Sequence, residues 1–180
     1  MIRNNLSCLE EVTNYRSNHS DSYLIVDTNV LLLLLVGIYD KAYLKECSLM
    51  KENGKCYGEE HFELMKKILG IFLYRVVITP HILSEINMHS KRISSGRFEA
   101  YFSRMLEQLE RFKEHYVSME ILSKNDAIIR FGFTDISLVE VAKSNKWVIL
   151  TDEFQLKRTF SECLPIIYFT NIVTSELMLK

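Results

Sequence analysis

The sequence has little glycine and proline, with only 6 Gly and 2 Pro among 180 residues. Average usage is about 7% for Gly and 5% for Pro, and these residues make most tight turns. A β-sandwich built from many hairpins is therefore not expected. Hydrophobic residues make up 48% of the chain and charged residues 25%, which excludes a disordered or low-complexity chain. These proportions predict one helix-rich globular domain over residues 1–180.

Paired cysteines are also missing. The four cysteines are irregularly spaced and form no CxxC pair: Cys8, Cys47, Cys56 and Cys163. Neither a zinc site nor a disulfide framework is predicted, and isolated thiols suit a reducing cytoplasm. Residues 1–20 contain no continuous apolar stretch. They are expected to form a polar N-terminal leader and do not resemble a secretory signal.

The one long apolar run is too short to cross a membrane. It extends from Val30 to Ile38, which is nine residues, whereas a transmembrane helix needs about 20. The polar residues 27–29 directly precede it and can cap a helix. We therefore expect a buried helix that follows a strand, and no membrane partner.

Short apolar runs alternate with helical patterns along the rest of the chain. Short apolar runs, typical of central parallel strands, occur at residues 23–26, 75–78 (which begins with Arg75), 147–150 and 165–169. Helical patterns occur at 59–73, 80–91, 97–115, 124–130, 135–144 and 154–163, and another is expected from residue 172. This alternation predicts an α/β fold with an open parallel sheet and helices on both faces.

The predicted helix at 97–115 carries an apolar seam. Its members step by four and three residues: Phe98, Phe102, Met105, Leu109, Phe112 and Tyr116. Such a seam could join two copies in a homodimer. Packing within its own domain is the preferred interpretation, because fewer than three heptads is short for a coiled coil.

Acidic residues stand where the predicted strands end. Asp27 closes the first strand, and Asp152 and Glu153 close the strand at 147–150. Glu85 lies in the helix after the second strand, and Asp135 begins the helix before the 147–150 strand. Each acid alone could be a helix cap or a solvated residue. Because ligands of open α/β sheets bind beyond the carboxyl ends of the strands, all of them are expected to share one crevice.

Such a cluster of carboxylates needs a counter-charge. Two carboxylates 4 Å apart repel by roughly 4 kcal/mol at an effective dielectric constant of 20. Mg²⁺ or Mn²⁺ relieves this repulsion, since both ions prefer oxygen ligands. One or two such ions are therefore predicted, and a pair can stabilise the attacking and leaving oxygens in phosphoryl transfer.

Four segments give the chain a family resemblance. They are Asp-Thr-Asn-Val-Leu at 27–31, Thr-Pro-His-Ile-Leu-Ser-Glu-Ile at 79–86, Gly-Phe-Thr-Asp-Ile-Ser-Leu at 132–138 and Val-Ile-Leu-Thr-Asp-Glu at 148–153. Together with their strands and helices, they resemble the PIN-domain (PilT N-terminus-like) ribonucleases in content and order. The resemblance covers residues 23–170.

The resemblance implies a fold, an activity and a set of site residues. The implied fold is a three-layer α/β/α sandwich, and the implied activity is Mg²⁺- or Mn²⁺-dependent endonucleolytic hydrolysis of single-stranded RNA that leaves 5′-phosphate and 3′-hydroxyl ends. By position, Asp27, Glu85 and Asp135 would be the acidic metal-binding and catalytic residues. Asn29 and Thr151 would be polar supports.

The fourth acid departs from the family pattern. The family usually has Asp two residues after the Thr that ends the strand. Here that position is Glu153, and Asp152 lies between. Both remain candidates for the metal site, with a slight preference for Asp152 because its shorter side chain matches the usual Asp.

Basic residues could steer the phosphate backbone of a substrate. The candidates are Lys91, Arg92, Arg97, Arg104, Lys157 and Arg158. A solvated charged face explains them nearly as well. The formal net charge of −1 at face value argues against a nucleic-acid partner. If four acids bind metal, however, 19 remain against 22 basic residues, a net charge of +3.

Other functions remain open. The chain is longer than the compact toxin members of the family, so a toxin with an antitoxin partner is less expected than a stand-alone nuclease. A catalytically inactive PIN-like scaffold or RNA-binding module is the alternative from another class. A structure-specific DNA nuclease is also chemically compatible with the acids.

Overall fold

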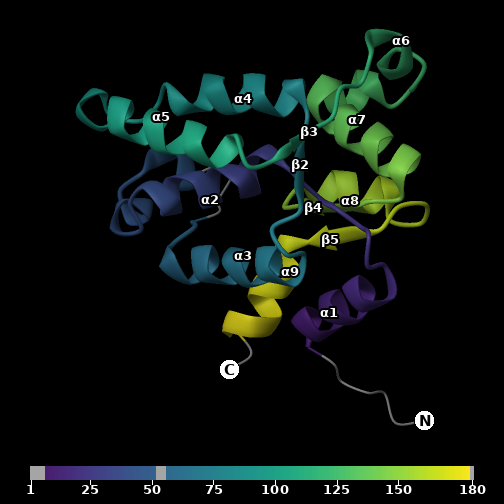
Figure 1. Ribbon diagram of the computed structural model, residues 1–180, viewed down its shortest axis with the longest axis horizontal. Helices are drawn as coiled ribbons and strands as arrows, with labels where there is room; N and C mark the ends of the chain where they lie inside the picture. Colours follow the sequence, from purple (N-terminus) through teal and green to yellow (C-terminus); the bar gives the residue numbers. More distant parts are fainter. Residues whose placement is uncertain (1–6, 52–55, 179–180) are drawn as a thin grey trace.

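The computed structural model describes residues 7–51 and 56–178. Its strands form one 5-stranded sheet in the order β3-β2-β1-β4-β5, and every pairing is parallel. The strands are β1 (Leu24–Val26), β2 (Val76–Ile78), β3 (Lys113–Glu114), β4 (Val148–Thr151) and β5 (Ile166–Tyr168). This sheet, covered by helices on both faces (Figure 1), confirms the predicted three-layer α/β/α fold.

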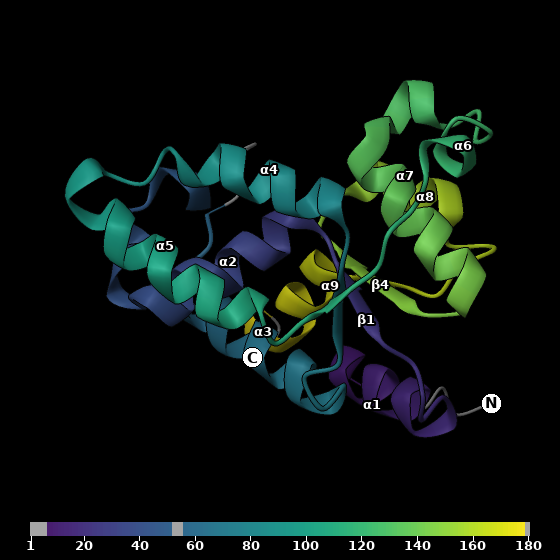
Figure 2. The ribbon, with the colours of Figure 1, turned by 45° about the horizontal axis from the view of Figure 1, so that its top comes forward.

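Helices α7 and α8 lie together on one side of the sheet, and α2, α3 and α5 lie on the other (Figures 1 and 2). The α-helices are α1 (Cys8–Asn18), α2 (Thr28–Tyr39), α3 (Glu59–Ile71), α4 (Pro80–Ser90), α5 (Ser95–Leu109), α6 (Met119–Leu122), α7 (Ile128–Asn145), α8 (Phe154–Phe160) and α9 (Phe169–Val173). Short 3-10 turns cover Ala42–Lys45 and Ser48–Met50, and a π-helical turn covers Thr174–Met178.

The core forms because the central elements are apolar throughout. All residues of β1 and β4 are buried, and Leu24 pairs with Val76 on one side and Val148 on the other. Helix α2 is buried over most of its length. A methyl group at Gly37 of α2 would overlap the ring of Phe62 in α3, so glycine permits the close approach of these two helices.

Residues 8–18, part of the stretch expected as a polar leader, instead form α1. Ser7 and Glu10 make a capping box at its start, and Val12 is buried in the hydrophobic core. Helix α1 contacts α3 and α9. Residues 1–6 of that stretch lie outside the described residues.

Two other elements differ from expectation. Helix α5 ends at Leu109 rather than at residue 115, and the seam packs against the core of the same chain except at Tyr116, which is 70% exposed. The two-residue β3 follows α5 and becomes an edge strand of the sheet. The break expected at 131–134 is confirmed, because α7 is divided into two helical segments at Gly132, where φ is 75°.

Within residues 7–51 and 56–178, no helix has the length and apolar character needed to span a bilayer. The long apolar run belongs to α2, which packs against α3 and α5.

Candidate active site

The candidate site lies at the edge where β1, β2 and β4 end. Asp27 follows β1 directly, the first turn of α4 follows β2, and Glu153 follows β4 after one intervening residue. The helices at this edge are close together, since α4 contacts both α2 and α7 (Figure 2). Parallel strands end at the same edge, which explains why residues far apart in sequence meet there.

Asp27 is buried at the N-cap position of α2 but makes no side-chain cap hydrogen bond. Its Oδ2 instead accepts a hydrogen bond from the Thr151 hydroxyl at 2.7 Å. The same Thr151 oxygen accepts the Glu153 N–H at 2.9 Å. Thr151 therefore ties the end of β4 to the end of β1, which fits the polar support role predicted for it.

Glu85 is half-buried in the second turn of α4. Its Oε2 accepts a hydrogen bond from the Thr28 hydroxyl at 2.7 Å. His89, one turn further along α4, places Nε2 3.9 Å from Glu85 Oε1. The hydrogen bond links the first turn of α2 to the second turn of α4, the helices that follow β1 and β2.

Asp135 follows the break at Gly132, where φ is 75° and ψ is −177°. A positive φ is readily adopted by glycine, and here it separates the first turn of α7 from the part that carries Asp135. Burial and, after it, the charges of Asp27, Glu85 and Glu153 together raise the pKa of Asp135 to about 7. These three acids therefore lie close enough to Asp135 for their charges to raise its pKa.

The pKa of Asp27 shifts in the same direction. Its pKa is raised to about 6, mainly by burial and also by the charge of Glu85, although the hydrogen bond from Thr151 lowers it. Both shifts indicate acids that lack a nearby positive charge. Among the described residues, no Lys or Arg forms an ion pair with Asp27, Glu85, Asp135 or Glu153.

The neighbouring acids Asp152 and Glu153 face different surroundings. Asp152 is buried and accepts hydrogen bonds from the Tyr57 hydroxyl and from both the N–H and the hydroxyl of Thr170. The Thr170 N–H lies 3.1 Å from Asp152 Oδ1. Glu153 is the N-cap of α8, where Oε1 accepts the Gln155 N–H at 3.1 Å. Of the two, Glu153 is the acid whose charge raises the pKa of Asp135. This effect favours Glu153 as the fourth acid of the site, whereas the sequence slightly favoured Asp152.

The oxygen atoms of these side chains are suitable ligands for a hard divalent cation, but the described side chains are not grouped closely enough to form a metal site. Four carboxylates and two threonine hydroxyls supply oxygen atoms, the ligands that Mg²⁺ and Mn²⁺ prefer. Within the ranges 7–51 and 56–178, no three His, Cys, Asp or Glu side chains are grouped as a metal site. Asn29, half-buried in the first turn of α2, makes no side-chain hydrogen bond in the described part of the chain.

The predicted phosphate-steering residues are dispersed. Arg97 donates to Asp40 Oδ2 at 2.9 Å and lies over the Tyr43 ring, so it joins α5 to the end of α2. Arg104 pairs with Glu107 at 2.7 Å. Lys91, Arg92 and Arg158 are exposed, and Lys157 lies over the ring of Tyr168.

Sequence reasoning missed one cation at this edge. Arg130 is exposed at the start of α7, and its Nη2 donates to Gln155 Oε1 in α8 at 2.7 Å. A single Arg ahead of a glycine break has no distinctive spacing, so the sequence offered no signal for it. The contact joins the start of α7 to the first turn of α8.

Comparisons with known proteins returned no match: no family model matches the sequence, and no curated protein or solved structure is significantly similar to the chain. The functional argument therefore depends on the residues and their arrangement.

Proposed function

We propose that this chain is a metal-dependent endonuclease that hydrolyses phosphodiester bonds of single-stranded RNA. The observation that supports the proposal is that four carboxylates lie at the same end of the sheet. The negative charges of Asp27, Glu85 and Glu153 all raise the pKa of Asp135. Perturbed, partly buried acids in the crevice beyond a parallel sheet are typical of functional sites. The segments that resemble PIN-domain ribonucleases contain these same four residues.

Asp27 and Asp135 would hold a Mg²⁺ or Mn²⁺ ion, with Glu85 and Glu153 completing the acidic surroundings or holding a second ion. When bound, the cation supplies Lewis-acid stabilisation of phosphate charge and lowers the pKa of water. Thr151 and Thr28 keep the carboxylates of Asp27 and Glu85 at the sheet edge by hydrogen bonding. Each of these hydrogen bonds uses one carboxylate oxygen, Oδ2 of Asp27 and Oε2 of Glu85, and leaves the other oxygen of that carboxylate for a cation.

The remaining residues have supporting roles in this proposal. Asp152 acts as a positioning residue, because its bonds to Tyr57 and Thr170 fix the turn that carries Glu153. Arg130 and Lys157 attract the phosphate backbone at the rim of the site. The cysteines that the structure describes are all free thiols, and we place the activity in a reducing cytoplasm.

The test is a cleavage assay on labelled single-stranded RNA and DNA, with Mg²⁺, with Mn²⁺ or with EDTA. We expect wild type to cut RNA only with a divalent cation. Asp27→Asn and Asp135→Asn should each lose at least about 100-fold in rate, since transition-state stabilisation by metal is worth several kcal/mol. Glu63→Gln, at a half-buried acid of α3 that pairs with Lys41, is the matched control and should cut at the wild-type rate.

Unchanged cleavage by both Asp→Asn variants would contradict the site assignment. Preferential cutting of DNA would replace RNA with DNA as the substrate while keeping the site.

A second candidate is a catalytically inactive RNA-binding or scaffold module. The observation that favours it is that no three acidic side chains are already grouped as a metal site within the described residues. Binding of RNA without cleavage in any divalent cation would support this candidate. The proposal does not include an antitoxin partner or a homodimer.

A further inference from the structure

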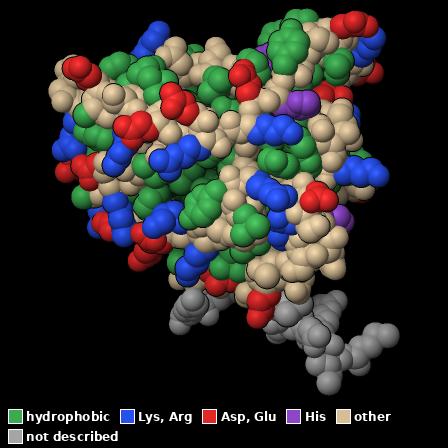
Figure 3. All heavy atoms as spheres, in the orientation of Figure 1, with side chains coloured by type: hydrophobic (Ala, Val, Ile, Leu, Met, Phe, Trp, Pro, Cys, Tyr) green, Lys and Arg blue, Asp and Glu red, His purple; other side chains and the backbone are tan. Residues whose placement is uncertain are grey.

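Two exposed aromatic side chains stand beside the acids. Phe133, two residues before Asp135, is 51% exposed, and Phe154, directly after Glu153, is 52% exposed. Burial of apolar area stabilises a fold, so a ring left in water forgoes that stabilisation. Rings exposed beside a catalytic candidate therefore suggest a binding role more than a packing role. Figure 3 shows hydrophobic side chains at the surface over α6 and α7.

Each of these rings is held from one side by a second ring. The Phe133 ring lies 6.3 Å from the ring of His81, at an interplanar angle of 24°. His81 is in the first turn of α4, one turn before Glu85. The Phe154 ring lies 6.1 Å from the Tyr168 ring, at 62°. These contacts orient two exposed rings that come from different elements of the site edge.

The two aromatic pairs lie at different parts of the acidic edge. The Phe133 pair belongs to α7 and α4, next to Asp135 and Glu85, whereas Phe154 begins α8 next to Glu153. Arg130 of α7 donates to Gln155 of α8 at 2.7 Å, so a cation lies where these two helices meet. Lys157 Nζ lies 5.0 Å from the centre of the Tyr168 ring. Aromatic faces next to cations are the combination that binds single-stranded nucleic acids.

We infer that Phe133 and Phe154 stack on nucleobases on the two sides of the phosphate that the acids engage. This inference rests on the proposed nuclease function and assigns its substrate as an unpaired RNA segment. Every base has a π-face, so stacking of this kind tolerates many sequences. In a duplex the faces are covered by neighbouring base pairs, so the two rings would select against paired RNA.

The test measures binding separately from cleavage. Fluorescence anisotropy is recorded in Mg²⁺ on the Asp27→Asn background, with a labelled unstructured RNA of about 12 nucleotides. The second probe carries the same phosphates but has abasic sites in place of the central bases, and the third is a duplex. Phe133→Ala and Phe154→Ala are compared with Phe133→Trp and Phe154→Trp. Circular dichroism confirms that each variant is folded.

We expect each Ala substitution to weaken binding of the single strand by about 5-fold to 100-fold. The Trp variants should bind as tightly as the parent or more tightly. The abasic probe and the duplex should bind weakly to the parent, and the Ala substitutions should not weaken them further. Tyr74→Ala is the matched control, since Tyr74 is 59% exposed but precedes β2 at the opposite edge of the sheet.

Single-strand binding that is unchanged in both Phe→Ala variants would overturn the stacking inference, and so would the absence of any RNA binding. A loss of cleavage in Asp27→Asn alongside unchanged binding in the Phe variants would leave the nuclease function intact. Weaker binding in the Phe variants without cleavage by wild type would instead reject the nuclease and keep the stacking surface.

Discussion

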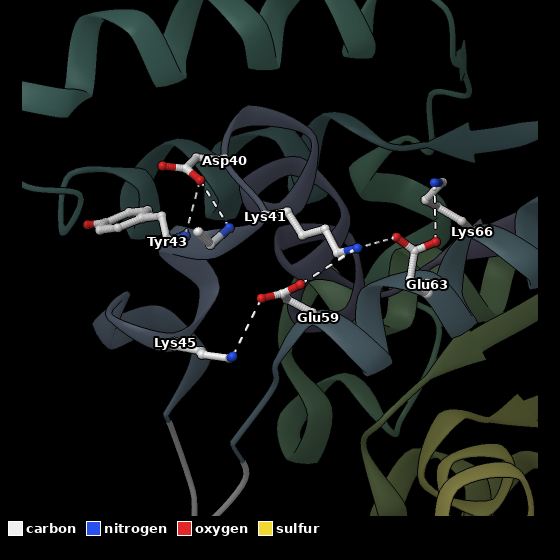
Figure 4. Close-up of polar contacts among 8 residues, drawn as sticks. Asp40, Lys41, Tyr43, Lys45, Glu59, Glu63 and Lys66 are labelled. Carbon is white, nitrogen blue, oxygen red and sulfur yellow. Dashed lines mark hydrogen bonds and ion pairs between the residues drawn. The ribbon is translucent and has the colours of Figure 1, made fainter.

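Two acidic regions of this molecule lie in opposite electrostatic surroundings. The first region contains Glu59 and Glu63 of α3. Here Lys41 Nζ contacts Glu63 at 2.9 Å and Glu59 at 3.6 Å (Figure 4). Lys45 and Lys66 complete the network, with Nζ 3.5 Å from Glu59 and 3.3 Å from Glu63. Hydrogen bonds from Lys41 and Lys66 lower the pKa of Glu63. The negative charges of Glu59 and Glu63 are therefore balanced by lysines of the same chain.

The second region is the edge with Asp27 and Asp135. There burial and neighbouring acids raise the pKa to about 6 for Asp27 and to about 7 for Asp135. In the part of the chain that the structure describes, the protein pairs these surface acids with lysines, whereas the four acids where the strands end form no ion pair with Lys or Arg. Such an arrangement lowers stability unless a cation from solution neutralises it. The predictions below test this difference, from the largest expected effect to the smallest.

Asp152→Ala should have the largest effect on stability. The substitution leaves the buried Tyr57 hydroxyl and the Thr170 N–H without their acceptor, and each unsatisfied group costs about 1 to 3 kcal/mol. We expect the free energy of unfolding in urea to fall by about 2 to 4 kcal/mol. Glu153→Ala, which removes a half-buried cap, should cost about 1 kcal/mol. Equal losses in the two variants would contradict the structural role of Asp152.

Asp135→Asn should stabilise the protein at pH 8 without divalent cations. The folded-state pKa is raised to about 7 from the ordinary value of 3.8 for an Asp carboxyl, so the unfolded state releases its proton first as pH rises. Wild type therefore loses stability from about pH 4 to pH 7, and the uncharged Asn does not. We expect an advantage of roughly 1 to 3 kcal/mol at pH 8 that vanishes below pH 4.

Urea unfolding of both proteins from pH 4 to pH 8 measures this advantage. An Asp135→Asn protein that is less stable than wild type at pH 8 would show that the carboxylate is compensated within the protein.

Lys41→Gln should have the smallest effect. Lys41 lies on the surface, where ion pairs are screened by water and salt. We expect the melting temperature to change by no more than about 2 °C, and the change should disappear in 1 M NaCl. A larger change that persists in salt would mean that the network near α3 is not a surface feature.

Much of the fold was predictable because its central elements have strong local patterns. The buried strands β1, β2 and β4 coincide with the short apolar runs, and Thr79-Pro80 begins α4 as capping chemistry predicts. The positions of the acids relative to strand ends followed from the same patterns. Helix α1 was not predicted, although Ser7 and Glu10 form a capping box, because it has too few apolar residues to show a helical repeat in the sequence.

The remaining errors have non-local causes. Asp152 and Glu153 are adjacent, and their different surroundings depend on Tyr57 and Thr170, which lie 95 and 18 residues from Asp152 in sequence. Strand β3 has only two exposed residues, Lys113 and Glu114, and forms because β2 offers a free edge. No local pattern in a single sequence contains this information.

Calorimetric titration of Mn²⁺ into EDTA-treated, dialysed protein tests the central claim most directly, because it asks whether the unpaired acids bind a divalent cation. The account predicts saturable binding of one or two ions by wild type and by Glu63→Gln, and at least about 10-fold weaker binding by Asp135→Asn, as expected when one carboxylate ligand is lost. Equal Mn²⁺ affinity in wild type and Asp135→Asn, or no binding by wild type, would contradict it.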